Sequence, residues 1–243
     1  MSLISYTLPC HQREADLRAT LPQVIAAANA APPVEIVLVD YGHPGTLVPL
    51  AWEHLRQCGE GVSLRTIRVE AQTFHMAHAR NVGITAAAGD IVVAFLADQT
   101  VAPSFFADVR TTLAPHTFLK WQETFAFWKT DIVAAGGFDE RFEFYGPEGK
   151  ELDDRLRRRG LERWSFPDGT VAQMRTPNKQ KVAHYRLPLT KTDMHERGMA
   201  IWRENMTQGL LVANEGRLWG TREVPTWHSH GLVAHSGSGG RSS

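Results

Sequence analysis

The sequence predicts an α/β fold built on parallel strands, and three observations lead to this prediction. Short runs rich in β-branched residues alternate with longer stretches of helical spacing over the first hundred residues. Each run is nearly continuous in apolar residues, as is typical of strands buried on both faces of a sheet. Polar residues follow the ends of these runs, where open α/β sheets bind their ligands. Together these features favour a nucleotide-binding half.

Four strands and three intervening helices are predicted in this part of the chain. The strands cover residues 3–8, 34–39, 62–69 and 91–96, and the helices cover residues 15–31, 46–58 and 75–88. The first helix stops before Pro32 and the last one before Gly89, two residue types that commonly end helices. Right-handed crossovers through these helices make the strands parallel.

The second half of the chain has a different character. Residues 118–185 are rich in aromatic residues and glycine, and a basic helix is predicted over 151–159. An amphipathic helix is predicted over 190–208, and the last residues are rich in Gly and Ser. Trp121, Trp128 and Tyr145 are either core residues of a second sheet or a stacking floor for a sugar.

The composition excludes several classes of protein. Of the 243 residues, 43% are hydrophobic and 21% charged, which is typical of a globular domain. The 26 basic and 26 acidic residues balance, so no overall charge favours nucleic acid or an anionic membrane. Two cysteines are too few for a disulfide scaffold. No secretory signal or membrane-spanning run is evident, so we expect a cytoplasmic protein.

Several motifs occur in an order that is shared with a known family. The first strand continues into Pro9-Cys-His-Gln-Arg, and the second strand reads Glu35-Ile-Val-Leu-Val-Asp-Tyr-Gly. Ala79-Arg-Asn-Val-Gly precedes Gly89-Asp and the fourth strand, and Gly136-Gly-Phe-Asp-Glu-Arg-Phe follows later. Over residues 3–185 the chain resembles family 2 glycosyltransferases, whose single α/β domain is known as the GT-A fold.

This resemblance implies a fold, a division of the chain and an activity. The fold is a Rossmann-like mixed sheet flanked by helices, with a C-terminal helical extension. Residues 1–103 form the nucleotide-binding half and 104–189 the acceptor half of one domain (1–189), followed by the extension (190–215) and a partly disordered tail (216–243). The implied reaction transfers a hexosyl or N-acetylhexosaminyl group from a nucleoside diphosphate sugar, UDP-sugar foremost, to an acceptor hydroxyl with inversion.

The catalytic base is expected at the start of the basic helix. The segment Glu148-Gly-Lys-Glu-Leu-Asp-Asp-Arg-Leu resembles the family's Glu-Asp-x-Asp-Leu helix, in which the Asp deprotonates the acceptor hydroxyl. Gly149 stands where the family has that Asp. We therefore expect Glu148 to be the base and Glu151 to be the second candidate. The alternative is that these carboxylates only complement the helix dipole.

A divalent cation, Mn²⁺ or Mg²⁺, is implied by the resemblance. The fourth strand ends in Leu96-Ala-Asp98, where the family has Asp-x-Asp, so Asp98 keeps the second carboxylate and Leu96 replaces the first. His184, in Val-Ala-His, resembles the family's third metal ligand. Hard cations prefer oxygen ligands, and imidazole is a common additional ligand. The alternative for Asp98 is a cap of the helix that follows Pro103.

The nucleotide is expected at the carboxyl ends of the strands. The residues predicted to hold it are Pro9, His11, Arg13, Asp40, Arg80 and Asp98. Asp40 is the preferred contact to the base, since a carboxylate can accept from uracil N3–H. Tyr41 is the alternative contact, through stacking on the base.

Two other functions compete with transfer. With Leu96 and Gly149 in place of two carboxylates, the domain could bind a nucleotide-sugar or a glycan without turnover. A sugar nucleotidyltransferase has a related core, but its phosphate loop needs glycines directly after the first strand, and Pro9 to Arg13 contain none. The acceptor and the oligomeric state cannot be derived from these motifs.

Overall fold

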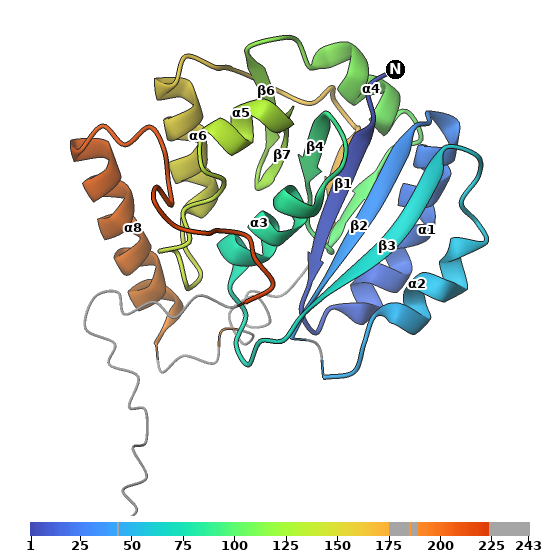
Figure 1. The fold of residues 1–243 in the computed structure, drawn as a ribbon, viewed down its shortest axis with the longest axis horizontal. Coiled ribbons are helices and arrows are strands. Elements are labelled where there is room, and N and C mark those ends of the chain that lie inside the picture. Colours follow the sequence, from blue (N-terminus) through green and yellow to red (C-terminus); the bar gives the residue numbers. More distant parts are fainter. Residues whose placement is uncertain (43, 175–184, 186–188, 224–243) are drawn as a thin grey trace, which may run out of the picture.

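The computed structural model describes residues 1–42, 44–174, 185 and 189–223. Its centre is a seven-stranded mixed sheet in the order β3-β2-β1-β4-β7-β6-β8, and a small second sheet pairs β5 with β9. Helices cover both faces of the large sheet, and a helix near the C-terminus packs beside α6 (Figure 1). The predicted architecture, a mixed sheet flanked by helices with a helical extension, is therefore confirmed.

The predicted N-terminal strands and helices are all present, with ends shifted by a few residues. The strands are β1 (Ile4–Cys10), β2 (Val34–Tyr41), β3 (Val62–Val69), β4 (Ile91–Ala94), β5 (Gln99–Val101), β6 (Thr117–Trp121), β7 (Thr124–Trp128), β8 (Glu162–Trp164) and β9 (Val171–Gln173). The helices are α1 (Glu14–Ala30), α2 (Val48–Leu55), α3 (Met76–Ala86), α4 (Phe105–Thr112), α5 (Lys129–Ala134), α6 (Glu148–Arg158) and α8 (Lys191–Thr207). The basic helix begins at Glu148, earlier than expected, which puts this residue in its first turn.

Two apolar clusters lie on opposite faces of the sheet, because successive side chains of a strand point to opposite sides. Helices α1, α2 and α4 contribute to one cluster, and α3, α5, α6 and α8 to the other. Strands β1 and β2 are buried throughout. Strand β3 differs from the expected continuous burial, since it lies at the edge of the sheet and five of its eight residues are partly or fully exposed.

The order of the strands reverses direction at β1. This strand pairs in parallel with β2 on one side, with Cys10 opposite Asp40, and with β4 on the other side, with Thr7 opposite Ala94. From β1 the chain passes to β2 and then to β3 on one side of β1. It then returns to form β4 on the other side, so the connections at the carboxyl ends of β1 and β4 lead in opposite directions. A topological switch point of this kind opens a crevice in which α/β proteins bind ligands.

The hairpin of β6 and β7 brings a turn to the same edge of the sheet. Strand β7 runs antiparallel to β4, with Phe125 opposite Ala94. The start of β7 therefore lies beside the carboxyl end of β4. The turn that precedes it consists of Gln122, which has a left-handed φ of 49°, and Glu123. A residue of this turn can consequently reach the crevice.

The C-terminal segment is hydrogen-bonded to the domain rather than only appended to it. After α8 the chain runs back across the molecule (red in Figure 1), and the Ala213 N–H donates to the Ala135 carbonyl at 3.0 Å. The Gly220 N–H donates to Glu140 Oε1 at 2.8 Å. The predicted extension thus contributes to the fold, and of the predicted tail 216–243 the structure describes 216–223.

We expect Gly136→Ala to destabilise the protein by about 2 kcal/mol or more. Gly136 has a φ of +77°, and a Cβ there would lie 1.9 Å from the Ala213 carbonyl oxygen. Gly160→Ala is the matched control, since its φ is +90° and no atom lies within 4 Å of its Cβ position. Urea unfolding of both variants measures the difference. Equal losses would contradict a role for the contact with the C-terminal segment.

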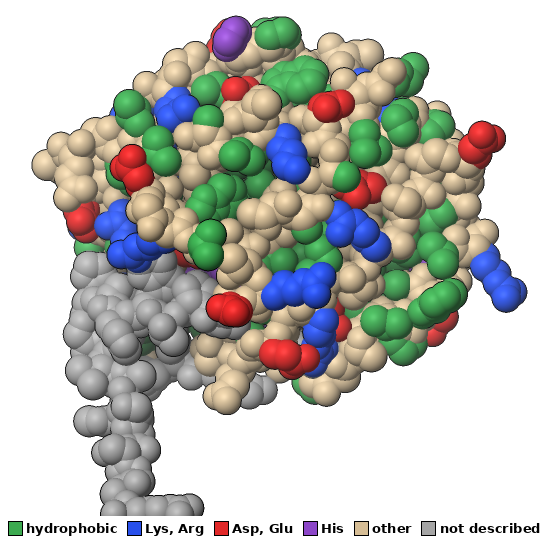
Figure 2. Space-filling model, viewed as in Figure 1, with side chains coloured by type: hydrophobic (Ala, Val, Ile, Leu, Met, Phe, Trp, Pro, Cys, Tyr) green, Lys and Arg blue, Asp and Glu red, His purple; other side chains and the backbone are tan. Residues whose placement is uncertain are grey.

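The outer surface carries both charges. On the face that Figure 2 shows, basic and acidic side chains are interspersed among apolar ones, in agreement with the formal net charge of zero. Among the described residues, no helix is both long and apolar enough to cross a membrane.

Candidate active site

A cavity of about 190 Å³ lies at the switch point of the sheet. It is lined by residues from the ends of β1 and β4, from α3 and the loop before it, from the β6–β7 turn and from the start of α6. Among them are Pro9, His11, Arg13, Phe74, Arg80, Leu96, Asp98, Glu123, Tyr145, Glu148 and Tyr185. Most of the residues predicted to bind the nucleotide therefore meet in one place.

The loop after β1 forms one wall of the cavity. His11 is buried, and its Nδ1–H donates to the Tyr41 carbonyl at 2.6 Å. The imidazole stacks on Phe74, with the ring centroids 5.3 Å apart and the planes 12° from parallel. This packing fixes the ring at the wall, beside Pro9 and Arg13.

Asp98 contacts this wall from the loop after β4. Its Oδ2 is 2.9 Å from Nη2 of Arg13, and the residue is 7% exposed. The helix that follows, α4, begins after Ser104, so Asp98 is not its cap. The ion pair between Arg13 and Asp98 instead joins the loops that follow β1 and β4 at the lining of the cavity.

The described residues do not by themselves form a metal centre. Leu96 lines the cavity two positions before Asp98 and offers no ligand atom, and Asp98 is paired with a guanidinium. Among the described residues, no three His, Cys, Asp or Glu side chains are grouped to hold a cation. His184, the other predicted ligand, lies outside the described residues. A metal ion at Asp98 therefore stays a prediction.

Asp40 does not line the cavity. It is fully buried, its Oδ2 accepts from the Leu47 N–H at 3.0 Å, and both of its oxygens accept from Nη1 of Arg68 at 3.0 Å. Tyr41 is also buried, and its hydroxyl is hydrogen-bonded to Nδ1 of His78 at 2.8 Å. Both side chains are held by hydrogen bonds within the protein at the end of β2. Either one could contact a nucleobase only if these hydrogen bonds were broken.

Arg80 is the buried cation of the cavity. The residue is 1% exposed, and its Nη2 donates to the Glu123 carbonyl at 2.9 Å. The guanidinium lies over the ring of Phe138, with Cζ 4.7 Å from the centroid. Its Nη1 is 3.9 Å from Oε2 of Glu123. Helix α3 thus places a fixed positive charge beside the β6–β7 turn.

Glu148 has the properties expected of a proton acceptor. It lies in the first turn of α6, is 7% exposed, and its Oε2 has no hydrogen-bond partner among the described residues. Burial and, after it, the negative charge of Glu123 raise the pKa of Glu148 to about 7, although Arg80 opposes the shift. A carboxylate with this pKa can take up a proton at neutral pH.

The space above Gly149 is filled by another side chain. A Cβ built on Gly149 would lie 2.0 Å from Oε2 of Glu123. The carboxylate that the motif lacks at 149 is therefore replaced in space by one from the β6–β7 turn. Sequence reasoning missed Glu123, and the only signal for it is a polar Gln-Glu pair between two aromatic-rich segments.

Glu151 lies away from the cavity, unlike the second-candidate base that was expected. It is fully buried and forms a bidentate ion pair with Arg155 at 2.9 Å, and Asn205 of α8 donates to it at 3.2 Å. Glu148 and Glu151 are three residues apart and lie on neighbouring parts of the helix surface, but the Glu151 carboxylate is held by Arg155 and Asn205. Glu151 joins α6 to α8, and we do not assign it a catalytic role.

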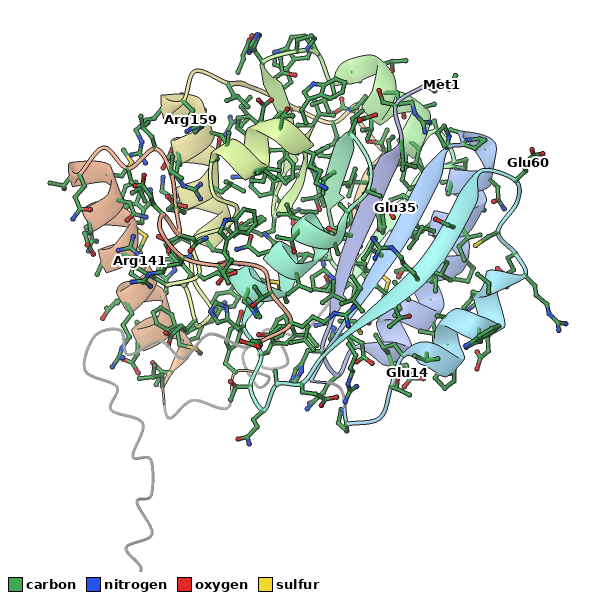
Figure 3. The ribbon with its side chains drawn as sticks, viewed as in Figure 1. Met1, Glu14, Glu35, Glu60, Arg141 and Arg159 are labelled. Carbon is green, nitrogen blue, oxygen red and sulfur yellow. The ribbon has the colours of Figure 1, made fainter. Side chains whose placement is uncertain are left out.

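A buried polar network surrounds this ion pair. Arg155 also donates to the carbonyls of Ala135 and Gly137, and Asn205 donates to Asp139 at 2.9 Å. Arg141, labelled in Figure 3 beside α8, pairs with Asp139 at 2.7 Å. The network holds the glycine turn, α6 and α8 together, and thereby fixes the start of α6 at the cavity.

The aromatic residues divide between cavity and core. Tyr145 lines the cavity, as do Phe74 and Tyr185, which the sequence did not indicate. The rings of Tyr145 and Tyr185 meet edge to face, with their centroids 6.4 Å apart. Trp121 and Trp128 are partly buried and pack against the cluster on the other face of the sheet. Aromatic rings therefore line part of the cavity, and one of them, Phe74, lies against His11.

Comparison with known proteins agrees with this architecture. The family model described as glycosyl transferase family 2 matches residues 5–115. No curated protein matches the chain in sequence.

Solved structures of low sequence identity share the fold. The mannosyltransferase PcManGT from Pyrobaculum calidifontis, in complex with GDP-Man and Mn²⁺, has a TM-score of 0.61 and 18% identity over 73% of this chain. TarS from S. aureus, in complex with UDP-GlcNAc, has a TM-score of 0.59 and 13% identity, over 84% of this chain and 72% of that chain. GalNAc-T7 with UDP, GalNAc and Mn²⁺ has a TM-score of 0.64 and 14% identity over 85% of this chain.

The chain spans 58% of the length of the mannosyltransferase and 50% of that of GalNAc-T7. At these identities the structural likeness establishes the fold, and the family match supplies the relationship in sequence. The family model thus matches a little under half of the chain, and the architecture is the GT-A fold.

Proposed function

We propose that this protein is a glycosyltransferase that moves a sugar from a nucleoside diphosphate sugar to an acceptor hydroxyl. The observation that carries the proposal is Glu148, a buried carboxylate with an unpartnered oxygen at the switch-point cavity. Relatives in fold bind GDP-Man, UDP-GlcNAc or UDP. A UDP-sugar carrying a hexosyl or N-acetylhexosaminyl group is the donor that we propose.

The residues of the cavity divide the work of the reaction. Pro9, His11 and Arg13 hold the nucleotide at the end of β1, and Arg13 faces the diphosphate. Glu148 takes the proton of the acceptor hydroxyl as its oxygen attacks the anomeric carbon. The bond from that carbon to the diphosphate breaks at the same time, and attack from the opposite face inverts the configuration. The negative charge that develops on the leaving diphosphate is stabilised by Arg13.

The proposal includes a divalent cation that two residues of this chain would bind. Asp98 and His184 are the predicted ligands of Mn²⁺ or Mg²⁺, and two of the compared structures contain Mn²⁺. Binding of a cation to Asp98 would have to compete with Arg13, whose guanidinium lies 2.9 Å from the carboxylate. When bound, the ion would supply positive charge to the diphosphate.

We expect one nucleoside diphosphate to raise the unfolding midpoint, because a ligand that binds only the folded state stabilises it. The panel is UDP, GDP, dTDP and CDP, each with and without Mn²⁺, on wild type and Asp98→Ala. A shift that needs Mn²⁺ and is lost in the variant supports the metal ligand. A shift that is independent of Mn²⁺ supports Arg13 as the partner of the diphosphate. No shift with any nucleotide contradicts the proposed donor class.

The second candidate is a domain that binds a nucleotide-sugar or a glycan without transferring it. Leu96 at the cavity favours this alternative, since the family's first metal carboxylate is missing there. Transfer or donor hydrolysis by wild type that disappears in Glu148→Gln excludes a mere binder. Nucleotide binding without any turnover supports it.

A further inference from the structure

Glu123 reaches the cavity from an element that carries no recognised motif. It follows Gln122 in the β6–β7 turn, and its Oε2 occupies the space where a side chain at position 149 would begin, 2.0 Å from the Cβ position. Its side chain is partly exposed, but this oxygen is buried and has no hydrogen-bond partner among the described residues. Like Glu148, it therefore presents a buried carboxylate oxygen without a hydrogen bond, although Nη1 of Arg80 lies 3.9 Å away.

The titratable groups around Glu148 come from four parts of the chain. Arg80 lies on α3, Glu123 in the β6–β7 turn, Tyr145 in the loop before α6, and Tyr185 follows β9 in the chain. Arg80 is the cation among these described groups and can neutralise one of the two carboxylates. Since a second buried charge is costly without its own partner, one of the carboxylates is driven to hold a proton.

The charge of Glu123 affects the pKa of Glu148. Burial raises the pKa of Glu123, while Arg80 and Lys120 lower it. Burial is the largest cause of the raised pKa of Glu148, and the charge of Glu123 is the next. The charge of Glu123 therefore contributes to the raised pKa of Glu148, which is about 7.

We propose that Glu123 is a positioning residue for the reaction: from the β6–β7 turn it supplies the negative charge that α6 lacks at Gly149, and so makes Glu148 a base for the acceptor hydroxyl. The inference rests on the proposed function. The acceptor O–H proton passes to Glu148, while the acceptor oxygen bonds to the anomeric carbon and the diphosphate leaves. Repulsion between the two carboxylates is relieved when Glu148 takes up the proton, and Arg80 retains Glu123 as its counter-ion.

The main test is the pH profile of kcat/KM for transfer in wild type and in Glu123→Gln. Without the charge at 123, the acid limb of the profile is expected to move to lower pH by about one unit. Glu148 is then a weaker base, so turnover above pH 8 falls about tenfold. A residue with a merely structural role would lower the rate without moving the limb.

A double variant tests the position of the charge. Glu123→Ala with Gly149→Asp returns a carboxylate to the same space from α6, and we expect the acid limb and the rate to move back toward wild type. Gly149→Asp alone adds a Cβ where Glu123 already lies, so its unfolding midpoint should fall. Glu60→Gln is the control, because it removes one negative charge at an exposed site far from the cavity (Figure 3). It should change neither the acid limb of the pH profile nor the rate.

A readout without turnover separates this inference from the proposed function. The carboxyl resonance of Glu148 in ¹³C NMR, assigned by its loss in Glu148→Gln, gives the titration midpoint directly. A midpoint that falls in Glu123→Gln supports the inference even if no sugar is transferred. An unchanged midpoint in folded Glu123→Gln overturns it, even if wild type proves to be an active transferase.

Discussion

Replacing Glu148 by Gln is expected to reduce sugar transfer by about 10²- to 10⁴-fold and to leave nucleotide binding in place. Gln keeps the size of the side chain but cannot take up the acceptor proton. The change leaves in place Pro9, His11 and Arg13, the cavity-lining residues that we propose to hold the nucleotide. Initial rates with UDP-sugar donors measure the loss, and the thermal shift with UDP measures binding. Sugar transfer by Glu148→Gln at the wild-type rate would contradict the assignment of Glu148 as the base.

The pH dependence of the wild-type reaction follows from the same residue. Glu148 acts as a base only when it is ionised, and its pKa is about 7. The rate is therefore expected to rise with pH through about 7 and to level off above it. A rate that is already constant between pH 5 and 6 would contradict this assignment.

The unfolding temperature of Glu148→Gln shows whether its loss of activity comes from the missing base or from a folding defect. A pKa raised from 4.5 to about 7 means that ionised Glu148 opposes folding. This cost is absent below pH 4.5 and reaches about 3 kcal/mol above pH 7, by the usual conversion of pKa into free energy. We therefore expect the variant to unfold at a higher temperature than wild type at pH 8. A lower midpoint would attribute the lost activity to damaged packing.

Arg155→Ala is expected to lower the free energy of unfolding by about 3–5 kcal/mol. Arg155 and Glu151 are both fully buried and joined by two hydrogen bonds of 2.9 Å. Removing the guanidinium leaves the charge of Glu151 in the interior, with Asn205 as its remaining side-chain donor among the described residues. The carbonyls of Ala135 and Gly137 lose a donor as well. Urea unfolding gives the change in free energy.

The double variant Glu151→Leu/Arg155→Met is the control for this prediction. It removes both charges, so the cost of an unpaired buried ion is avoided and the loss should be smaller than in Arg155→Ala. Since α6 carries Glu148 at its first turn, we also expect Arg155→Ala to weaken transfer at temperatures well below its unfolding. Equal losses in the single and double variants would show that charge pairing is not the cause.

The sequence by itself determined the elements and the edge at which the site lies. Alternating β-branched runs and helical stretches are local patterns, and residues such as Pro32 and Gly89 end helices without help from distant parts of the chain. Carboxyl ends of parallel strands share one edge of a sheet, so Pro9, His11, Arg13 and Asp98 could be predicted to gather there. Their positions at one cavity agree with that reasoning.

Only the tertiary structure decided which carboxylates face the cavity. Asp40 is paired with Arg68, which lies 28 positions away. Glu151 is paired with Arg155 on its own helix and also accepts from Asn205, which lies 54 positions away. Glu123 enters the space above Gly149 because β7 pairs antiparallel with β4. The reason is physical: a carboxylate has the same chemistry anywhere in the chain, and its charge is neutralised or left to act on substrate by the groups that folding brings next to it.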